Sequence, residues 1–339
     1  RKMNAGGFYL GRPRLAVLSQ DKNGRHACDY SNLDFWQPDM PYLYTPVMTL
    51  ERLIRENRVE YCPGIIVKSW RREKDNLVVE ARSHKDGRPV EFRCRRLILA
   101  AGAANSGRIA LQSRRDFHSR LPLLDNPALQ FPFVIPRHIG RSLEKEAFGL
   151  TQLNMIYDRG NKDLLCQGSI LEVTSPARAE FYSYFPMPAG DNIRLIKYLL
   201  PALAVMQLFL PASPRNPAFL SLQPSGKISI RRRKKEDESG LIQNIIRGFR
   251  RLGGWTHPRL VVRTPDGHGI HYAGTLPMGS RPEGAYCCSS DGELSGDPNV
   301  FVVDGALFPG LPAKNFSLTV MANAMRIAGT IARKIKEMP

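Results

Sequence analysis

The first hundred residues alternate between a helical and a strand-like spacing of apolar positions. Over residues 49–58, leucine and isoleucine recur every three to four positions among charges, which predicts an amphipathic helix with Thr49 as its N-cap. Shorter apolar runs are typical of strands, and they lie at residues 15–18, 59–61, 65–70, 77–81, 90–94 and 96–101. A turn is expected at Asp86 and Gly87.

The apolar run that ends at Ala101 has the pattern of a strand buried on both faces. Gly102 follows at once, and residues 105–113 then read as a helix. Strand, glycine turn and helix in this order place a helix N-terminus beside a ligand in α/β folds. One such unit is not specific for a nucleotide, and no G-x-G-x-x-G occurs in the 339 residues.

The most apolar stretch lies at residues 192–211, where Lys197, Pro201 and Gln207 interrupt it. Three interpretations are open: a membrane span, a patch that contacts a membrane surface, or an element or lid of a substrate-binding domain. The interruptions favour the last, since a span needs about 20 predominantly apolar residues in a row.

The C-terminal third contains two helical patterns and one buried-type strand at residues 300–303. In the first helix, residues 241–252, apolar positions share one side and the arginines lie off it, and Gly253 ends the helix. The second helix forms the tail. Its apolar stripe is expected to face the core and consists of Leu318, Met321, Met325, Ala328, Ala332 and Ile335, continued by Ile327 and Ile331.

Composition limits the possible classes of function but does not identify one. With 339 residues and 42% hydrophobic side chains, the chain is expected to fold into one large or two smaller domains. The net charge of +18 allows nucleic acid, an acidic glycan or a membrane surface as partner, or simply indicates a basic surface. The basic stretches 227–235 and 247–251 hold a single aromatic residue, Phe249, on an apolar face. Nucleic-acid binding is therefore not expected, since interleaved aromatics are missing.

The six cysteines show no C-x-x-C spacing, so neither a zinc site nor a disulfide scaffold is expected. This usage favours a reducing compartment such as the cytoplasm, although the compartment itself is not determined.

Three polar residues in the C-terminal quarter are candidates for catalytic or cofactor-binding roles. His271 lies in a glycine-rich run, and a histidine has a suitable pKa to take a hydroxyl proton near neutral pH; His268 competes for this role. Asp304 follows the predicted strand and precedes Gly305, which suits a polar cofactor group or an ordinary turn. Asn315 stands just before the tail helix, whose N-terminus is electropositive.

Four motifs, taken together and in this order, resemble the glucose–methanol–choline (GMC) family of FAD-dependent oxidoreductases. They are Ala100-Ala101-Gly102-x-x-Asn105-Ser106, His271-x-x-Gly274-Thr275-x-x-Met278-Gly279, Val303-Asp304-Gly305-x-x-x-Pro309 and Asn315-x-x-x-Thr319-x-x-Ala322-x-Ala324-x-Arg326. The similarity covers most of the chain and is weakest across residues 115–225.

The resemblance implies FAD as cofactor and a small-molecule alcohol or sugar as substrate. It implies that His271 is the catalytic base, that Asn315 assists it at the same substrate oxygen, and that hydride passes to flavin N5. Positions that contact the flavin dinucleotide in the family match Val67, Ala101, Gly102, Asp304, Gly305 and Phe316. The backbone of Val67 is expected to meet the adenine.

The resemblance also implies a mixed α/β (α+β) fold. A partial, Rossmann-like FAD-binding domain is expected at residues 1–115 and 255–339, and an antiparallel-sheet substrate-binding domain at residues 116–254. The family's N-terminal strand–GxGxxG–helix, which holds the FAD pyrophosphate, has no match in this sequence. We therefore expect a preceding segment, or a partner chain, to carry it, and Arg1 fits a chain shown without its native start. The second family signature also departs, because Gly107 follows Ser106 where proline is usual.

The expected function is thus FAD-dependent oxidation of an alcohol (CH–OH) substrate. The alternative is an FAD-less or split GMC-like chain that serves as a non-catalytic partner or scaffold. The sequence indicates neither the alcohol nor whether oxygen is the electron acceptor, and contact with a membrane surface stays an open interpretation.

Overall fold

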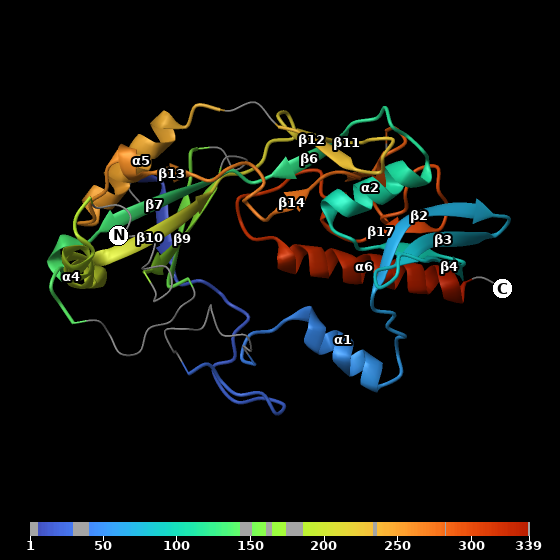
Figure 1. The fold of residues 1–339 in the computed structure, drawn as a ribbon, viewed down its shortest axis with the longest axis horizontal. Helices are drawn as coiled ribbons and strands as arrows, with labels where there is room; N and C mark the ends of the chain where they lie inside the picture. Colours follow the sequence, from blue (N-terminus) through green and yellow to red (C-terminus); the bar gives the residue numbers. More distant parts are fainter. Residues whose placement is uncertain are drawn as a thin grey trace. The chain divides into compact units, whose positions relative to one another are not determined.

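The structure is a computed structural model of the chain. It describes residues 6–29, 41–142, 151–160, 165–173, 186–232, 236–281 and 283–337. The chain divides into two compact units made of non-consecutive segments (Figure 1). The first comprises Arg1–Tyr61, Ala128–Phe209 and Asp237–Thr264, and the second comprises Cys62–Pro127, Leu210–Glu236 and Pro265–Pro339. Both units combine helices with antiparallel sheet, so the predicted mixed α/β fold is confirmed.

The boundaries of the units differ from the expected ranges 1–115 with 255–339 and 116–254. Residues up to Tyr61 belong with the first unit, because β1 (Phe8–Gly11) pairs antiparallel with β8 (Leu153–Tyr157). Residues 116–127 and 210–236 belong with the second unit instead. The assignment of one unit to flavin binding and the other to substrate binding stays a prediction.

The first unit is built on a six-stranded antiparallel sheet in the order β1-β8-β9-β10-β7-β13. Its remaining strands are β7 (Ala128–Val134), β9 (Cys166–Glu172), β10 (Leu203–Phe209) and β13 (Val262–Arg263). Leu129, Phe131 and Phe133 alternate with less buried residues along β7, as expected of a strand with one face on the core.

Helix α5 (Ser239–Arg251) covers this sheet with its apolar face. The ring of Phe249 stacks on Phe133 at 4.4 Å between centroids and lies 6.2 Å from Phe131. The arginines at the end of α5 are exposed, so the predicted division of this helix into apolar and basic sides is confirmed. The unit also contains α1 (Pro46–Arg55), α4 (Ala189–Leu199) and 3-10 turns at Pro136–His138, Leu200–Ala202 and Pro258–Leu260.

The apolar stretch at residues 192–211 is divided between two elements. It supplies most of α4 and then, after a 3-10 turn that contains Pro201, strand β10. Among the helices of the described ranges, none combines the length and the apolar character needed to cross a bilayer.

The second unit contains small sheets around one core. Strands β2 (Ile65–Glu73), β3 (Asn76–Ser83) and β4 (Pro89–Cys94) form an antiparallel meander, and β5 (Leu97–Leu99) pairs in parallel with β17 (Val300–Val302). A third sheet has the order β12 (Ile228–Arg231), β11 (Ala218–Leu222), β6 (Leu121–Asp125), β14 (Tyr272–Ala273). Strands β15 (Met278–Gly279) and β16 (Cys288–Ser289) form a parallel pair. The helices are α2 (Ala103–Ser113) and α6 (Ser317–Lys336), with a 3-10 turn at Gly305–Leu307.

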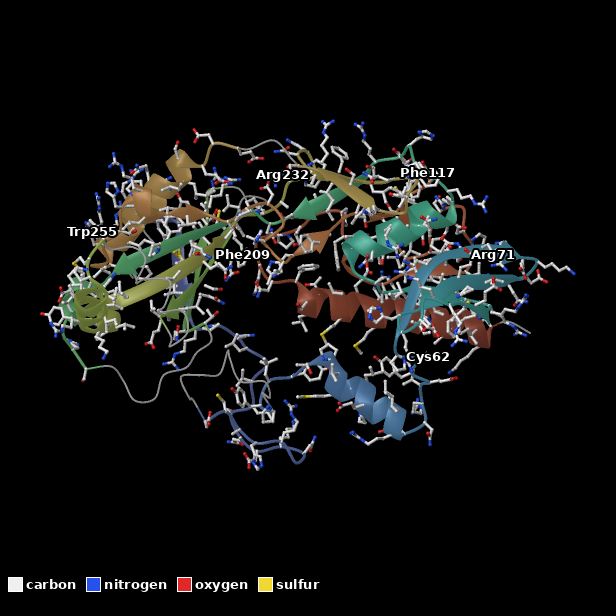
Figure 2. All side chains as sticks on the ribbon, in the orientation of Figure 1. Cys62, Arg71, Phe117, Phe209, Arg232 and Trp255 are labelled. Atoms are coloured by element: carbon white, nitrogen blue, oxygen red, sulfur yellow. The ribbon has the colours of Figure 1, made fainter. Side chains whose placement is uncertain are left out.

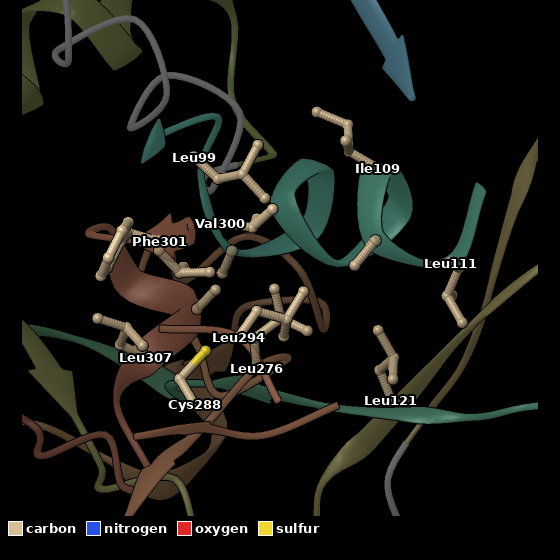
Figure 3. Close-up of a cluster of buried hydrophobic side chains, with 14 of the residues drawn as sticks. Leu99, Ile109, Leu111, Leu121, Leu276, Cys288, Leu294, Val300, Phe301 and Leu307 are labelled. Atoms are coloured by element: carbon tan, nitrogen blue, oxygen red, sulfur yellow. The ribbon is translucent and has the colours of Figure 1, made fainter. Parts of the chain in front are cut away.

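The core of the second unit lies around α2 (Figure 3). Ile109 and Leu111 of α2 are buried with Leu99 of β5, Leu121 of β6 and Phe301 of β17. The predicted strand–glycine–helix segment is therefore present, with β5 shorter than expected and α2 beginning right after Gly102.

An ion-pair network covers one face of the meander. Arg71, labelled in Figure 2, donates to Glu73, Glu80 and Glu91 at 2.8–2.9 Å. These carboxylates hold the pKa of the Arg71 guanidinium above its ordinary value. The side chains are largely solvated, so the network adds little stability per pair.

Local predictions for the first sixty residues were partly wrong. Helix α1 begins at Pro46 after Thr45, whereas Thr49 lies inside it and shares a 2.8 Å hydrogen bond with the Tyr44 hydroxyl. Proline is well suited to the first helical position, because its missing N–H would have no partner there. The expected strands at residues 15–18 and 59–61 do not form; Val17 makes only an isolated bridge to Leu43.

The stripe expected to bury α6 was only partly right. Its continuation, Ile327 and Ile331, is buried as predicted, whereas Leu318 is 78% and Met325 is 76% exposed. The helix is therefore present as predicted, and it packs through the side of Ile327 and Ile331 and not through the rest of the stripe.

Candidate functional site

His271 stands immediately before β14, at the edge of the second unit's four-stranded sheet. Pairing of Tyr272 with Asp125 and of Ala273 with Leu124 fixes this segment against β6. The imidazole is buried to 8% exposure and meets the Phe316 ring edge-on, with centroids 5.7 Å apart and the planes at 85°.

The backbone that leads into His271 is held in an unusual conformation. Ile270 has φ of 54°, a region that β-branched residues rarely adopt. A Cβ on Gly269 would lie 2.3 Å from the Asn126 carbonyl oxygen, so only glycine fits there. Asn126 is itself anchored, because its amide donates to the carbonyls of Leu210 at 2.8 Å and Pro312 at 3.2 Å. Strain of this kind persists only where surrounding structure imposes it, and it is common at functional sites.

The segment after His271 is hydrogen-bonded to the turn that follows β17. Gly274 N–H donates to the Gly305 carbonyl at 3.2 Å, and Leu276 N–H donates to Ala306 at 3.0 Å. A Cβ on Gly305 would lie 2.6 Å from the Tyr272 carbonyl oxygen and 3.3 Å from the Phe316 ring. Gly305 therefore lets these two chain segments approach each other closely.

The carboxylate of Asp304 joins the ends of the two parallel strands. It accepts from Gly102 N–H at 2.8 Å and Ser106 Oγ at 2.5 Å, and from Ala306 N–H at 2.8 Å. Asp304 is buried, and these donors come from both the β5 and the β17 turn. In this structure Asp304 braces the candidate site. Its predicted contact with a flavin dinucleotide stays a prediction.

Ser106 and Thr275 are structural residues to which the sequence analysis gave no role of their own. Thr275, fully buried, donates from Oγ1 to the Ala103 carbonyl at 2.6 Å and so links the His271 segment to α2. A Cβ on Gly107 would lie 2.9 Å from the Thr275 Cβ. Glycine at the family signature's proline position therefore lets α2 contact Thr275. Both residues belong to the motifs that carried the GMC resemblance, and those motifs were the sequence feature from which a role for them could have been predicted.

Burial lowers the pKa of His271 below its ordinary value of 6.5. The physical cause is the loss of water around the charged imidazolium. The ring is therefore neutral at pH 7, which is the state in which a histidine can accept a proton.

Asn315 and Phe316 occupy the N-terminal end of α6, where the sequence placed them. Phe316 is the residue that precedes the first turn of α6, and Asn315 is exposed beside it. The Phe316 ring contacts both His271 and Phe308, at 6.0 Å from the latter in an edge-to-face arrangement. This places Asn315 next in sequence to the ring that packs on His271.

Ala101, Gly102 and Val67 lie around α2. Gly102 has φ of 83°, and a Cβ there would meet nothing within 4 Å, so the turn before α2 borders open space. Val67 sits at a bulge in β2, and its carbonyl accepts from the Arg108 guanidinium at 3.0 Å. Ala101 N–H donates to Ser106 Oγ at 3.3 Å.

All eight predicted site residues belong to the second unit. The structure joins His271, Gly305 and Phe316 through packing, and joins Gly102 to Asp304 through a hydrogen bond. Val67 is further away along β2, and its link to the others runs through α2. The roles of all eight remain predictions.

A cavity of about 450 Å³ lies elsewhere in the second unit. Its polar lining includes Asp125, Asp266, Arg232 and Tyr272. Successive side chains on an extended segment point to opposite sides, so Tyr272 and the adjacent His271 face different surroundings. Neither His271 nor Phe316 lines the cavity. No cluster of three or more potential metal-binding side chains occurs in the described part of the chain.

The two predicted basic clusters are described only in part by the structure. Residues 233–235 of the predicted cluster lie outside the described residues, and Arg231 and Arg232 before them are exposed. The arginines of residues 247–251 belong to the first unit.

Comparison with known proteins confirms the family resemblance. Residues 257–324, which contain His271, Asp304 and Asn315, match the family model GMC oxidoreductase. This segment is therefore similar to the C-terminal part of the GMC oxidoreductases, a family whose members are FAD flavoproteins.

Two similar proteins are both named C-glycoside 3-oxidase. The one from Microbacterium trichothecenolyticum is 42% identical over 71 residues, which are 21% of this chain and 14% of that protein. The one from Arthrobacter globiformis is 32% identical over 115 residues, or 33% of this chain and 22% of that protein. The matches thus span less than a quarter of either relative.

The fold resembles that of pyridoxine 4-oxidase from Mesorbium loti, with a TM-score of 0.51 and 15% identity. The superposition covers 79% of this chain and 57% of the solved one. At this level of identity the likeness concerns the fold.

Proposed function

We propose that this chain provides the catalytic part of an FAD-dependent GMC oxidoreductase that oxidises an alcohol carbon. The observation that carries the proposal is the buried His271, which packs on Phe316 and whose own segment is hydrogen-bonded to the Gly305 turn, with burial lowering the pKa of its imidazole. A base held in this way beside two strand ends suits proton removal from a substrate bound at that edge.

The residues present suit FAD in part. The open space at Gly102 and the N-terminus of α2 would admit a polar cofactor group, and the Gly305 and Phe316 segments lie in the same cluster. Ala101 and Val67 would contribute backbone contacts. FAD, when bound, supplies a hydride acceptor. A G-x-G-x-x-G for its pyrophosphate is missing from the 339 residues, so we propose that another polypeptide segment supplies this motif.

His271 and Asn315 act on the same substrate oxygen in different ways. The neutral imidazole accepts the hydroxyl proton, and the lowered pKa keeps it available at neutral pH. The Asn315 amide donates a hydrogen bond to the same oxygen and orients it. Phe316 packs edge to face on the imidazole and is itself backed by Phe308, so one side of the ring faces an aromatic side chain instead of water.

We infer that the substrate is a sugar-type secondary alcohol, with a simple alcohol as the less favoured class. The support is that both similar proteins bear the name C-glycoside 3-oxidase, and one of them is 42% identical over its matched segment.

A second candidate function is a non-catalytic, FAD-less partner or scaffold. The observation that favours it is the missing phosphate-binding motif. It requires that the purified protein, in the form in which cells make it, shows no flavin absorbance.

The test is anaerobic mixing of the flavin-containing protein with a C-glycoside and, separately, with a simple alcohol. His271→Ala should retain flavin yet reduce it about 10²–10⁴-fold more slowly, because a positioned base contributes that much. The matched control is His268→Ala, three residues away, which should reduce flavin at nearly the parent rate. Parental rates in His271→Ala would overturn the base assignment, and a colourless protein would favour the scaffold.

A further inference from the structure

The end of the first unit at which β7 finishes carries many exposed basic and apolar side chains. Three segments meet there, and together they are called the basic end below: residues 134–142, 187–203 and 249–262. Val134 N–H donates to the Trp255 carbonyl at 2.8 Å, and Gly140 N–H donates to the Tyr198 carbonyl at 3.1 Å. Backbone hydrogen bonds therefore hold the three segments side by side, with α4 and Trp255 at the same end of the unit (Figures 1 and 2).

Cations dominate the surface of the basic end. Its exposed basic side chains include Arg141, Arg194, Lys197, Arg250 and Arg259. The only acidic residue in these three segments is Asp191, whose carboxylate lies 3.6 Å from the Arg194 guanidinium and balances that one charge. A surface with this balance attracts an anionic partner.

Large apolar side chains are exposed among these cations. Tyr198 of α4 is 58% exposed, and Trp255 is 50% exposed. Ile193 of α4 and Leu252 at the end of α5 are each 40% exposed. Exposed apolar side chains that gather in one region mark an interaction surface, so the partner offers apolar groups as well as negative charge.

Helix α4 combines both properties on its exposed side. Its buried residues are Asn192 and Ile196. On the exposed side Lys197 follows Ile193 by four positions, and Tyr198 follows Arg194 by four, so each apolar side chain has a cation one turn away. Basic side chains cover apolar surface with their stems and extend the charge outward. This arrangement suits the boundary between lipid headgroups and acyl chains.

We propose that the basic end of the first unit binds the surface of a membrane that contains anionic lipids. Tyr198 and Trp255 enter the headgroup region, where amphipathic aromatic rings are favoured. The lysine and the arginines contact the anionic headgroups. A nucleic acid or an acidic polysaccharide suits the surface less well, because Ile193 and Leu252 would then stay in water. The inference goes beyond the proposed oxidation and does not depend on it.

Sedimentation with lipid vesicles tests the proposal on the purified protein in the form in which cells make it. One set of vesicles contains phosphatidylcholine alone, and the other contains phosphatidylcholine with an equal amount of phosphatidylserine. We expect about tenfold or stronger binding to the phosphatidylserine vesicles, and a loss of that preference in high salt, because salt screens exposed charges.

A pair of charge reversals separates the basic end from the net charge of the chain. Lys197→Glu with Arg259→Glu should weaken binding to phosphatidylserine vesicles about tenfold or more. The matched control is Lys85→Glu with Arg95→Glu, which makes the same change in net charge at exposed positions of the second unit and should bind like the parent. All four side chains are exposed, so both variants should keep the parental unfolding midpoint.

A second variant distinguishes a bilayer from an anionic polymer. Ile193→Ser with Leu252→Ser keeps every charge and should weaken vesicle binding about fivefold, because less apolar surface enters the lipid. Retention of this variant on heparin or on single-stranded RNA should equal that of the parent, since those polymers read the charges alone.

Tryptophan fluorescence reports the contact directly. Trp70 is buried at 3% exposure, whereas Trp255 is exposed. Phosphatidylserine vesicles should therefore shift the emission of the parent to shorter wavelength, because the Trp255 indole leaves water. Trp255→Phe should remove most of this shift.

Four results would overturn the proposal: equal binding to both kinds of vesicle, equal losses in the two charge-reversal pairs, parental vesicle binding in Ile193→Ser with Leu252→Ser, or a full emission shift in Trp255→Phe. None of these measurements uses turnover or the flavin. A failure of alcohol oxidation therefore leaves the membrane surface standing, and absent vesicle binding leaves the proposed oxidation untouched.

Discussion

Asp304 accepts a 2.5 Å hydrogen bond from Ser106, a residue 198 positions earlier in the chain. The same carboxylate also accepts from Gly102 N–H. One buried side chain thus holds together the turns at the ends of two parallel strands. The candidate site is built on this junction.

Removing the Ser106 hydroxyl is expected to loosen the junction. A hydrogen bond to a charged group is worth about 1.5–3 kcal/mol, so Ser106→Ala should lower the unfolding free energy by that amount. Ser229→Ala, an exposed serine on β12, is the control and should change it by less than about 0.5 kcal/mol. Urea unfolding followed by circular dichroism compares the two. Equal midpoints for both variants would show that the Asp304 contacts contribute nothing measurable.

Two helical glycines should respond to alanine in opposite directions. A Cβ on Gly107 would press on Thr275 at 2.9 Å, whereas one on Gly329 in α6 would meet nothing within 4 Å. Gly329→Ala should therefore stabilise the chain by about 0.5–1 kcal/mol through helix propensity. Gly107→Ala should destabilise it, because overpacking costs about 1–3 kcal/mol. Thermal midpoints of the two variants measure the difference. A stabilised Gly107→Ala would mean that α2 and the His271 segment are not in close contact.

His271 should make stability depend on pH. Its pKa is lower in the folded chain than its ordinary value of 6.5. As the pH falls below 6.5, the unfolded chain therefore binds a proton that the folded chain does not, and stability decreases until the folded-state pKa is reached. His271→Gln should flatten the fall of the urea midpoint between about pH 7 and pH 5. His84→Gln, at an exposed position, serves as control. An unchanged slope in His271→Gln would contradict the burial of a neutral ring.

The two faces of α6 can be separated by truncation. Ile327→Ala removes a fully buried side chain and should lower the unfolding free energy by about 2–5 kcal/mol. Met325→Ala removes one that is 76% exposed, so its effect on the chain by itself should stay within about 0.5 kcal/mol. Chemical denaturation of the purified chain gives both values. If Met325→Ala were the more destabilising, the apolar stripe inferred from periodicity would be the core face after all.

Arg114 ties the end of α2 to the segment before β17. It donates from Nε at 3.0 Å and a second nitrogen at 2.6 Å to one carboxylate oxygen of Asp297, and it also contacts the carbonyls of Ala285 and Ser295. Arg114→Met leaves these partly buried acceptors without their donor and should cost about 3 kcal/mol. The exposed Arg88–Asp86 pair provides the control, since Arg88→Met should change stability by less than about 1 kcal/mol. Similar losses in both variants would argue that Arg114 acts only as a surface charge.

The local elements of the second unit followed from the sequence to a large extent. Short apolar runs predicted β2, β3 and β4, and the glycine after the apolar run at residues 97–101 predicted the turn into α2. The start of α1 was missed, because Pro46 at the first turn outweighed the capping tendency of Thr49. The candidate site was predicted as separate motifs, and their contacts through Asp304, Thr275 and Phe316 join residues that are far apart in sequence.

By itself the sequence determined the types of most elements and the GMC resemblance, and it supplied the prediction that His271 is a base with Asn315 as its partner. Those conclusions rest on spacing within short segments, and spacing is a local property. Only the tertiary structure decided which face of α6 is buried and how the two units divide the chain. It also showed that the Asp304 carboxylate accepts hydrogen bonds from the turns that follow both parallel strands. These outcomes depend on contacts between segments that are distant in the sequence. Helix α6 has apolar residues on two faces, so its periodicity is the same whether the face with Ile327 or the face with Met325 packs on the core.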